Sequence, residues 1–161
     1  MGKDKKLNSM RLLEQHSIPY EVLHYDASTR DATEVAELIG LPEFMVYKTL
    51  VVQSVTTDRP ILTLIASDRQ LDLKAVAAVT GEKKVRMAAH ADAERLTGLQ
   101  VGGISALMLT QKNWPVYLDQ PATELQHVVI SAGERGTQLK VPVLPLMSLL
   151  KARVGQLSRE A

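Results

Sequence analysis

The pattern of hydrophobic and polar positions is clearest in two apolar segments, residues 46–52 and 61–66, which a polar turn at 56–60 separates. Both segments consist mainly of aliphatic and β-branched residues and contain no Gly, Pro or acidic residue, which is typical of β-strands. Two such strands joined by a short turn predict a β-hairpin. Side chains alternate along a strand, so one face of the first segment carries Val46, Lys48, Leu50 and Val52.

The charged member of that face, Lys48, lies among aliphatic side chains. Burying an unpaired ammonium group is costly, so a lysine on a core face needs a physical reason. One interpretation is that Lys48 meets an anion or lines a cleft that receives one. The alternative is a lysine on an edge strand, where its charge discourages aggregation. Periodicity alone leaves both interpretations open.

Apolar residues recur every three or four positions in several other segments, and this spacing predicts amphipathic helices. The expected helices cover residues 6–15, 32–39, 73–79, 91–96 and 143–154. Asp31 and Asp72 are placed to cap two of them, and Gly40 and Gly81 are placed to end the same two. Further short strands are expected at residues 20–24, 83–88, 116–118, 127–131 and 138–141.

The order of these elements predicts the fold class. Strands outnumber helices and come in hairpin-like pairs with helices between them, which favours a mixed α/β domain of the α+β type over a regular βαβ winding. The chain has 161 residues without a repeat or a shift in composition, so we expect one domain over residues 1–161.

Composition excludes several classes of function. The chain contains no cysteine, which excludes disulfides, thiolate zinc sites and a protein thiol nucleophile. The net charge of +1 creates no global field toward nucleic acid, so any RNA contact must come from a local patch. We find neither a signal peptide nor a run of 18 apolar residues, and therefore expect a cytoplasmic protein with no membrane contact.

Few residues carry recognisable chemistry. The four histidines, at positions 16, 24, 90 and 127, lack metal-ligand spacing, and no nucleophile elbow or glycine-rich phosphate loop occurs. We therefore expect no metal and no cofactor. Two glycine-containing segments, 102–105 and 131–133, would let the backbone approach a ligand, with N–H groups facing a carbonyl oxygen. Tight turns are the alternative for both, and Tyr25 could wall a pocket or be a half-exposed core residue.

Taken together, these segments resemble the YbaK family of free-standing aminoacyl-tRNA deacylases, which is related to the editing domain inserted in bacterial prolyl-tRNA synthetases. The resemblance is ordered and runs through most of the chain. It is carried by residues 24–25, 34–41, 46–50, 70–74, 83–88, 97–98, 101–105 and 131–136.

The resemblance implies a fold and a site. The implied fold is a single editing domain with a mixed, barrel-like curved β-sheet flanked by helices and a cleft for the aminoacyl end of tRNA. The family's essential lysine falls on Lys48, which is thereby implied as the catalytic residue. The implied substrate-binding residues are Tyr25, Thr49, Gly102, Gly103, Ile104, Ser131 and Gly133.

The implied function is trans-editing, in which the aminoacyl ester of a mischarged tRNA, foremost Cys-tRNA(Pro), is hydrolysed. Alternatives are an Ala-tRNA(Pro) deacylase and a non-catalytic module that binds tRNA or a synthetase. The chain departs from the family pattern at Asp31, Ala106, Met108 and Gln138, and the first three of these favour the non-catalytic alternative. The implied partner is the acceptor end of an aminoacylated tRNA, with prolyl-tRNA synthetase as a further candidate.

A basic surface for tRNA is a separate hypothesis. Its residues would be Lys83, Lys84, Arg86, Lys112 and Arg135. A solvated basic face without a ligand is the simpler interpretation of the same residues.

Overall fold

The predicted hairpin forms the centre of a five-stranded sheet in a computed structural model that describes residues 6–29 and 31–161. Strand β2 (Tyr47–Ser54) pairs antiparallel with β3 (Pro60–Ala66), and Lys48 lies opposite Ile65. Strand β5 (Val85–Met87) extends the sheet beyond β2 in antiparallel orientation. On the other side, β6 (Val116–Asp119) and then β9 (Arg153–Gly155) add in parallel, so the sheet is mixed.

Two smaller sheets complete the strand arrangement. An antiparallel sheet has the order β1-β8-β7 and contains β1 (Glu21–His24), β8 (Thr137–Pro142) and β7 (His127–Ser131). Strand β4 (Arg69–Leu71) pairs antiparallel with β10 (Ser158–Glu160). An isolated parallel bridge between Val46 and Val129 links β7 to the residue before β2.

The prediction of one barrel-like curved sheet is wrong. The strands in the described part of the chain form three sheets, and no closed or curled barrel is found among them. The physical reason lies at the junction between β2 and β7, where the two larger sheets share the Val46–Val129 bridge rather than a continuous hydrogen-bonded ladder. The class itself is confirmed, because the chain is a single α+β domain with mixed sheets.

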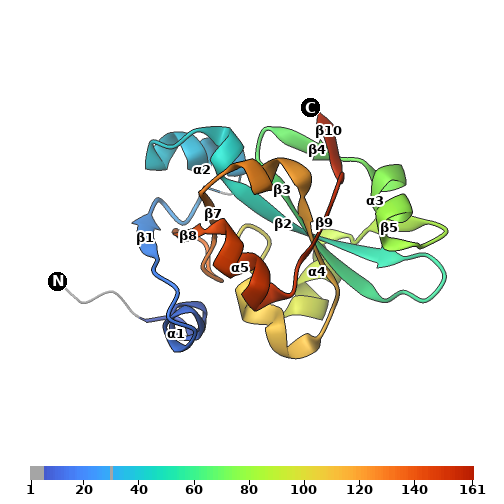
Figure 1. Cartoon of the computed structure of the whole chain (residues 1–161), viewed down its shortest axis with the longest axis horizontal. Coiled ribbons are helices and arrows are strands. Elements are labelled where there is room, and N and C mark those ends of the chain that lie inside the picture. Colours follow the sequence, from blue (N-terminus) through green and yellow to red (C-terminus); the bar gives the residue numbers. More distant parts are fainter. Residues whose placement is uncertain (1–5, 30) are drawn as a thin grey trace.

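Five α-helices and three 3₁₀ helices connect the strands of the described chain. The α-helices are α1 (Asn8–Gln15), α2 (Ala32–Ile39), α3 (Leu73–Thr80), α4 (His90–Thr97) and α5 (Val143–Leu150). The 3₁₀ helices are η1 (Glu43–Met45), η2 (Ala106–Lys112) and η3 (Gln120–Glu124). Figure 1 shows α1 and β1 at one end of the molecule and α3 with β5 at the other, while β2 and β3 run between them.

The predicted helix caps are confirmed at α2 and α3. The Asp31 side chain accepts a hydrogen bond from the Thr33 N–H, and Asp72 accepts from the N–H groups of Lys74 and Ala75. Gly40 and Gly81 follow the two helices in the left-handed conformation, with φ of 73° and 79°. The aspartates fix where α2 and α3 begin, and the glycines fix where the two helices end.

The core lies on both faces of the central sheet. On one face Leu62 and Leu64 of β3 belong to a large cluster with Leu139 of β8 and Leu146 of α5. On the other face Ile61 and Ile65 of β3 pack with Val76 of α3 and Leu157. Every residue of β3 is buried, as expected for a strand covered on both faces.

The C-terminal region differs from the prediction. The expected helix over 143–154 ends at Leu150, and Lys151 adopts the left-handed conformation with φ of 53°. The chain then turns into β9, which joins the central sheet beside β6. Strands β4, β9 and β10 have three residues each, which is too short for alternation to be recognised in the sequence. Among the described residues, no helix is long and apolar enough to cross a membrane.

Candidate functional site

A cavity of about 190 Å³ lies beside β2, and it contains the lysine that the strand pattern singled out. It is bounded by the start of β2, the first turns of α2 and α4, the end of β5, the loop after α4, and strands β7 and β8. Five of the eight predicted site residues line it, namely Lys48, Thr49, Gly102, Ile104 and Ser131. The fold therefore brings together residues that are far apart in the chain.

Lys48 is half-buried, and its surroundings change its acidity. Burial lowers the pKa of the Lys48 ammonium below its ordinary value, because desolvation disfavours the charged form. The carboxylates of Asp31 and Asp68 raise the pKa of Lys48, but their effect is smaller than that of burial. Of the other residues on the same strand face, Val46 and Val52 are fully buried and Leu50 is half-buried, so Lys48 lies in an aliphatic setting.

The loop after α4 places glycine backbone against the cavity. Gly102 lines the cavity with φ of 93°, a conformation that favours glycine. The Gly103 N–H already donates to the Gln100 carbonyl at 2.8 Å, so it is not available to a ligand oxygen. Within residues 6–29 and 31–161, the Gly102 N–H has no hydrogen-bond partner. Of the two glycines predicted to donate a backbone N–H to a ligand oxygen, Gly102 is therefore the one whose N–H is available.

Gly103 has a packing role instead. A Cβ atom at this position would lie 2.9 Å from the backbone N of Arg135 and 2.9 Å from the carbonyl carbon of Glu134. The Arg135 Nε donates a hydrogen bond to the Val101 carbonyl at 2.7 Å across the same contact. The two glycine-containing turns of the sequence thus pack against each other and together form one wall of the site.

Ser131 and Gly133 belong to the second of these turns. Ser131 is buried at the end of β7, and its Oγ accepts a hydrogen bond from the Gly133 N–H at 3.1 Å. Gly133 has φ of 115°, and a Cβ atom there would lie 2.6 Å from the Met108 Cγ. Gly133 is not among the cavity-lining residues, so its contribution is to hold Ser131 and the turn in place.

Tyr25 contacts the site through a residue that was not predicted as part of it. Tyr25 does not line the cavity, but the Gln138 Nε2 donates to its hydroxyl oxygen at 3.5 Å. Gln138 lies opposite Ser131 in the β7–β8 ladder and lines the cavity. Its Oε1 is buried and has no hydrogen-bond partner in the described chain. A buried acceptor without a partner is unfavourable, so Gln138 is a candidate ligand contact.

Sequence reasoning treated Gln138 only as a departure from the family pattern and did not place it in the site. Alternation along a strand shows on which face a residue lies. It does not show whether the side-chain oxygen of a glutamine has a hydrogen-bond partner. His90 was also missed, because it is an isolated histidine in the sequence, yet it lines the cavity from the start of α4. In the part of the chain that the structure describes, no group of three or more His, Asp or Glu residues could hold a metal ion.

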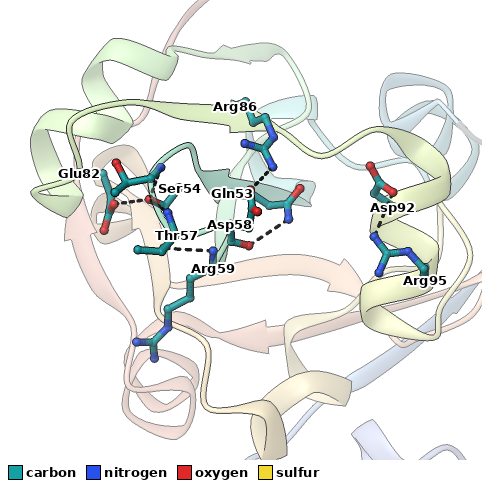
Figure 2. Close-up of polar contacts among 10 residues, drawn as sticks. Gln53, Ser54, Thr57, Asp58, Arg59, Glu82, Arg86, Asp92 and Arg95 are labelled. Atoms are coloured by element: carbon teal, nitrogen blue, oxygen red, sulfur yellow. Dashed lines mark hydrogen bonds and ion pairs between the residues drawn. The ribbon is translucent and has the colours of Figure 1, made fainter.

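The predicted basic surface has internal partners at three of its five positions. Arg86 forms an ion pair of 2.5 Å with Asp58, at the tip of the β2–β3 hairpin. Figure 2 shows this contact beside the hydrogen bond from the Gln53 side chain to the Asp58 carbonyl. Arg135 bonds to the Val101 carbonyl, and the Lys112 Nζ lies 5.2 Å from the centroid of the Trp114 ring. The remaining residues of that surface are Lys83 and Lys84, which are exposed.

The fold defines a known class of α+β domain. The solved structure described as "hypothetical protein APE2540" superposes with a TM-score of 0.86 at 23% identity, covering 94% of this chain and 99% of that one. A second structure, described as "a putative trans-editing enzyme for prolyl tRNA synthetase", gives a TM-score of 0.80 at 24% identity and covers 97% and 99% of the two chains. At these identities the likeness shows the fold.

The sequence comparisons identify the family. The model of the aminoacyl-tRNA editing domain matches residues 26–149. A protein of Enterococcus faecalis named "Putative Cys-tRNA(Pro)/Cys-tRNA(Cys) deacylase EbsC" is 34% identical over 163 residues, which covers 98% of both chains. The chain therefore belongs to the YbaK/EbsC family of aminoacyl-tRNA editing domains.

Proposed function

We propose that this protein hydrolyses the aminoacyl ester of mischarged tRNA, with Cys-tRNA(Pro) as the principal substrate. The observation that carries the proposal is the half-buried Lys48 in a small cavity with Gly102 and Ser131. Membership of the editing family supports an aminoacyl-tRNA substrate, and the name of the Enterococcus faecalis relative supports cysteine as the amino acid. One editing domain over residues 1–161, acting in the cytoplasm where charged tRNA occurs, is part of this proposal.

Lys48 acts on the developing charge of the reaction. Attack on the ester carbonyl converts its oxygen into an oxyanion, and the Lys48 ammonium together with the Gly102 N–H stabilises this charge. The bond between the carbonyl carbon and the ribose oxygen then breaks, and the ribose oxygen leaves with the proton that the nucleophile gives up. Where the nucleophile is the substrate's own thiol, this step gives a cyclic thioester, which water then opens to the free amino acid. The cavity provides no protein thiol, and the Ser131 Oγ accepts from a backbone N–H rather than donating to a histidine. Two nucleophiles remain, a water molecule and the side-chain thiol of the substrate.

The shape of the cavity suits a small aminoacyl group. Its walls include Val35, Val46 and Ile104, and a cysteine side chain behaves as a small hydrophobic group in such surroundings. Size alone gives little selectivity, because one methylene is worth only about 1–3 kcal/mol in a hydrophobic pocket. Attack by the substrate's own thiol would select cysteine without a large difference in binding. Attack by water would make Ala-tRNA(Pro) a comparable substrate.

Gln138 offers the acceptor that an aminoacyl group needs. A charged α-amino group carries three N–H donors, and the unpartnered Gln138 Oε1 faces no donor of the described chain. We assign the α-ammonium group of the substrate to this oxygen, with Tyr25 and Thr49 positioning the same end of the aminoacyl group. The Tyr25 hydroxyl holds the Gln138 amide through its contact with Nε2.

Three of the four departures from the family pattern lie outside the cavity lining, whereas the fourth, Gln138, lines the cavity. Asp31 caps α2 through Thr33, and Ala106 is buried at the start of η2. Met108 packs against Gly133 in the neighbouring turn. These were the residues that favoured a non-catalytic module, and none of them lines the cavity. Their positions support an enzyme rather than a binding module.

The test is a deacylation panel. We expect wild-type protein to release amino acid from Cys-tRNA(Pro), and Lys48→Ala to reduce kcat/KM about 100-fold or more, the usual effect of removing one oxyanion donor. Ala- and Ser-charged tRNA(Pro) separate the two nucleophiles, because only cysteine carries a thiol. Equal hydrolysis by wild type and Lys48→Ala, or retention of charged tRNA without release, would contradict the proposal.

A further inference from the structure

A second, open groove adjoins the cavity on the other side of Lys48. Its volume is about 1020 Å³, and it lies along β4, the first turn of α3 and β10. Lys48, Leu50 and Met87 line both the groove and the cavity, so the two meet at these side chains. Figure 1 shows β4 and β10 next to each other at the C-terminal end of the chain, above β3. A ligand whose reactive end enters the cavity can therefore extend into the groove.

The groove is lined by cationic side chains. Besides Lys48 they are Arg69 of β4, Lys74 of α3 and Arg159 of β10. The acidic side chain among the lining residues is Asp72, whose Oδ1 accepts from the N–H groups of Lys74 and Ala75. The whole chain has a net charge of only +1, so this is a local concentration of positive charge.

Two of these cations are available to a ligand, and a third is fixed in place. Lys74 and Arg159 are exposed, and their side chains form no ion pair or hydrogen bond with the described residues. Arg69 donates from Nε to the Ser158 Oγ at 3.0 Å and from Nη2 to the Ser158 carbonyl at 3.2 Å. A guanidinium has five N–H donors, so these two bonds hold Arg69 while leaving donors for an anion.

We infer that this groove binds the phosphodiester backbone of the single-stranded 3′ end of an RNA, with Lys74 and Arg159 as phosphate contacts. The inference rests on the proposed function, because an ester in the cavity places the attached nucleotides at the junction near Lys48. Leu50 and Met87, which is 42% exposed, provide an apolar surface there for the terminal base. The phosphates that follow then lie along Arg69, Lys74 and Arg159.

The inference assigns RNA binding to residues other than those that the sequence suggested. Lys83 and Lys84 are exposed lysines outside both cavities, so they provide a matched control of equal charge. The experiment compares the double variant Lys74→Gln/Arg159→Gln with the double variant Lys83→Gln/Lys84→Gln. A 5′-labelled oligoribonucleotide ending in CCA is titrated with each protein at several salt concentrations, and binding is followed by fluorescence anisotropy.

For the groove variant we expect the Kd to rise about tenfold and the slope of log Kd against log salt to fall by about 1.4, or about 0.7 for each lost single-strand phosphate contact. The control variant should keep the wild-type Kd and slope. Equal losses in the two variants, a loss only in the control, or no loss in either would overturn the inference.

Catalysis separates this inference from the proposed function. The groove variant should show a raised KM for Cys-tRNA(Pro), while its rate on 3′-cysteinyl-adenosine, which has no phosphate, stays at the wild-type value. An equal loss of activity on both substrates would overturn the inference that the groove binds RNA. Failure of wild-type protein to hydrolyse either substrate would overturn the proposed function, and the binding measurement would still decide whether the groove takes RNA.

Discussion

At the scale of single residues, Lys48 shows why a charge is kept in an apolar setting. Burial costs solvation of the ammonium group, and the Asp31 and Asp68 carboxylates return only part of that cost. Neither carboxylate forms an ion pair with it in the described structure. A lysine placed in this way is unfavourable for stability, which agrees with the proposal that Lys48 binds an anionic ligand.

The lowered pKa of Lys48 predicts a pH dependence of activity. Only the protonated amine stabilises an oxyanion, so kcat/KM should fall as pH rises through a pKa that lies below the ordinary lysine value. In Lys48→Arg the guanidinium stays charged, so this alkaline decline should disappear even if the maximal rate is lower. Rates are measured on Cys-tRNA(Pro) with subtraction of spontaneous hydrolysis. If the alkaline decline were unchanged in Lys48→Arg, the decline would have to come from the titration of a group other than Lys48.

The same shift predicts a pH dependence of stability with the opposite sign. The unfolded chain keeps the Lys48 proton up to the ordinary pKa, whereas the folded chain releases it at lower pH. Between the two values the unfolded state binds more protons, so the free energy of unfolding should rise with pH through this window. Urea unfolding of wild type and Lys48→Met at several pH values measures the difference, and parallel profiles for the two proteins would contradict the shift.

Gln138 provides a further prediction at the residue scale. If its Oε1 accepts from the α-ammonium group, Gln138→Leu should lower kcat/KM about tenfold or more, since hydrogen bonds to charged groups are worth about 1.5–3 kcal/mol. Gln138→Glu keeps an acceptor of similar size and should retain most of the activity. The deacylation assay on Cys-tRNA(Pro) compares the two variants. Loss in the glutamate variant with retention in the leucine variant would show that this atom does not meet a cation.

At the scale of elements, the site depends on two turns that are far apart in the sequence. Residues 101–104 and 131–136 are joined by the Arg135–Val101 hydrogen bond and by the close approach at Gly103. Strand β2 supplies Lys48 and Thr49, and β7 and β8 supply Ser131 and Gln138. The lining comes from strands, helices and a loop that are far apart in the chain, so the cavity exists only when these elements have assembled.

The contact at Gly103 predicts a sharp steric effect. Gly103→Ala places a Cβ atom 2.9 Å from backbone atoms of residues 134 and 135, which cannot move as a side chain can. We expect a loss of about 1–3 kcal/mol in the free energy of unfolding, together with loss of deacylation, because the wall of the site must shift. Gly81→Ala is the control, since nothing lies within 4 Å of its Cβ position.

The control should cost only about 1 kcal/mol, from the left-handed backbone at Gly81, and leave activity unchanged. Both variants are compared by urea unfolding and by the deacylation assay. If Gly103→Ala were as stable and as active as wild type, the close packing of the two turns would be contradicted.

At the scale of the whole molecule, a buried carboxylate joins the C-terminal strand to the central sheet. Asp119 at the end of β6 is 1% exposed, and it accepts from the Leu157 N–H at 2.9 Å and from the Ser158 hydroxyl. Ser158 in turn accepts from Arg69 of β4. Asp119 therefore helps to hold the small β4–β10 sheet, which forms the groove, against the main sheet.

This connection predicts a coupled loss of stability and RNA binding. Asp119→Ala leaves two buried donors unpaired, each costing about 1–3 kcal/mol, so the free energy of unfolding should fall by about 2–6 kcal/mol. Amide exchange in residues 157–160 should accelerate, and affinity for the CCA oligoribonucleotide should fall. Leu144→Ala is the control, because Leu144 is 72% exposed. Slow exchange in residues 157–160 of the Asp119 variant would contradict the anchoring role.

Much of the fold could be predicted from local pattern. The hairpin of β2 and β3, the capped helices α2 and α3, and the strands β7 and β8 follow from alternation, capping residues and glycine positions. The C-terminal strands could not be predicted in this way, because three-residue strands are stabilised by their partners rather than by their own sequence. The prediction of a barrel-like sheet was wrong because sheet closure depends on pairing between strands that are far apart in the sequence.

The sequence by itself determined the local elements and the position of Lys48 among aliphatic residues, because alternation in a strand depends only on neighbouring residues. Tertiary structure decided that Gly102 rather than Gly103 has an available N–H, and that Gln138 lines the cavity. It also decided which cations are available to a ligand. These are Lys74 and Arg159 in the groove, whereas Arg86 and Arg135 have partners within the protein. Hydrogen-bond partners and cavities arise between segments far apart in the chain, and no local pattern records them.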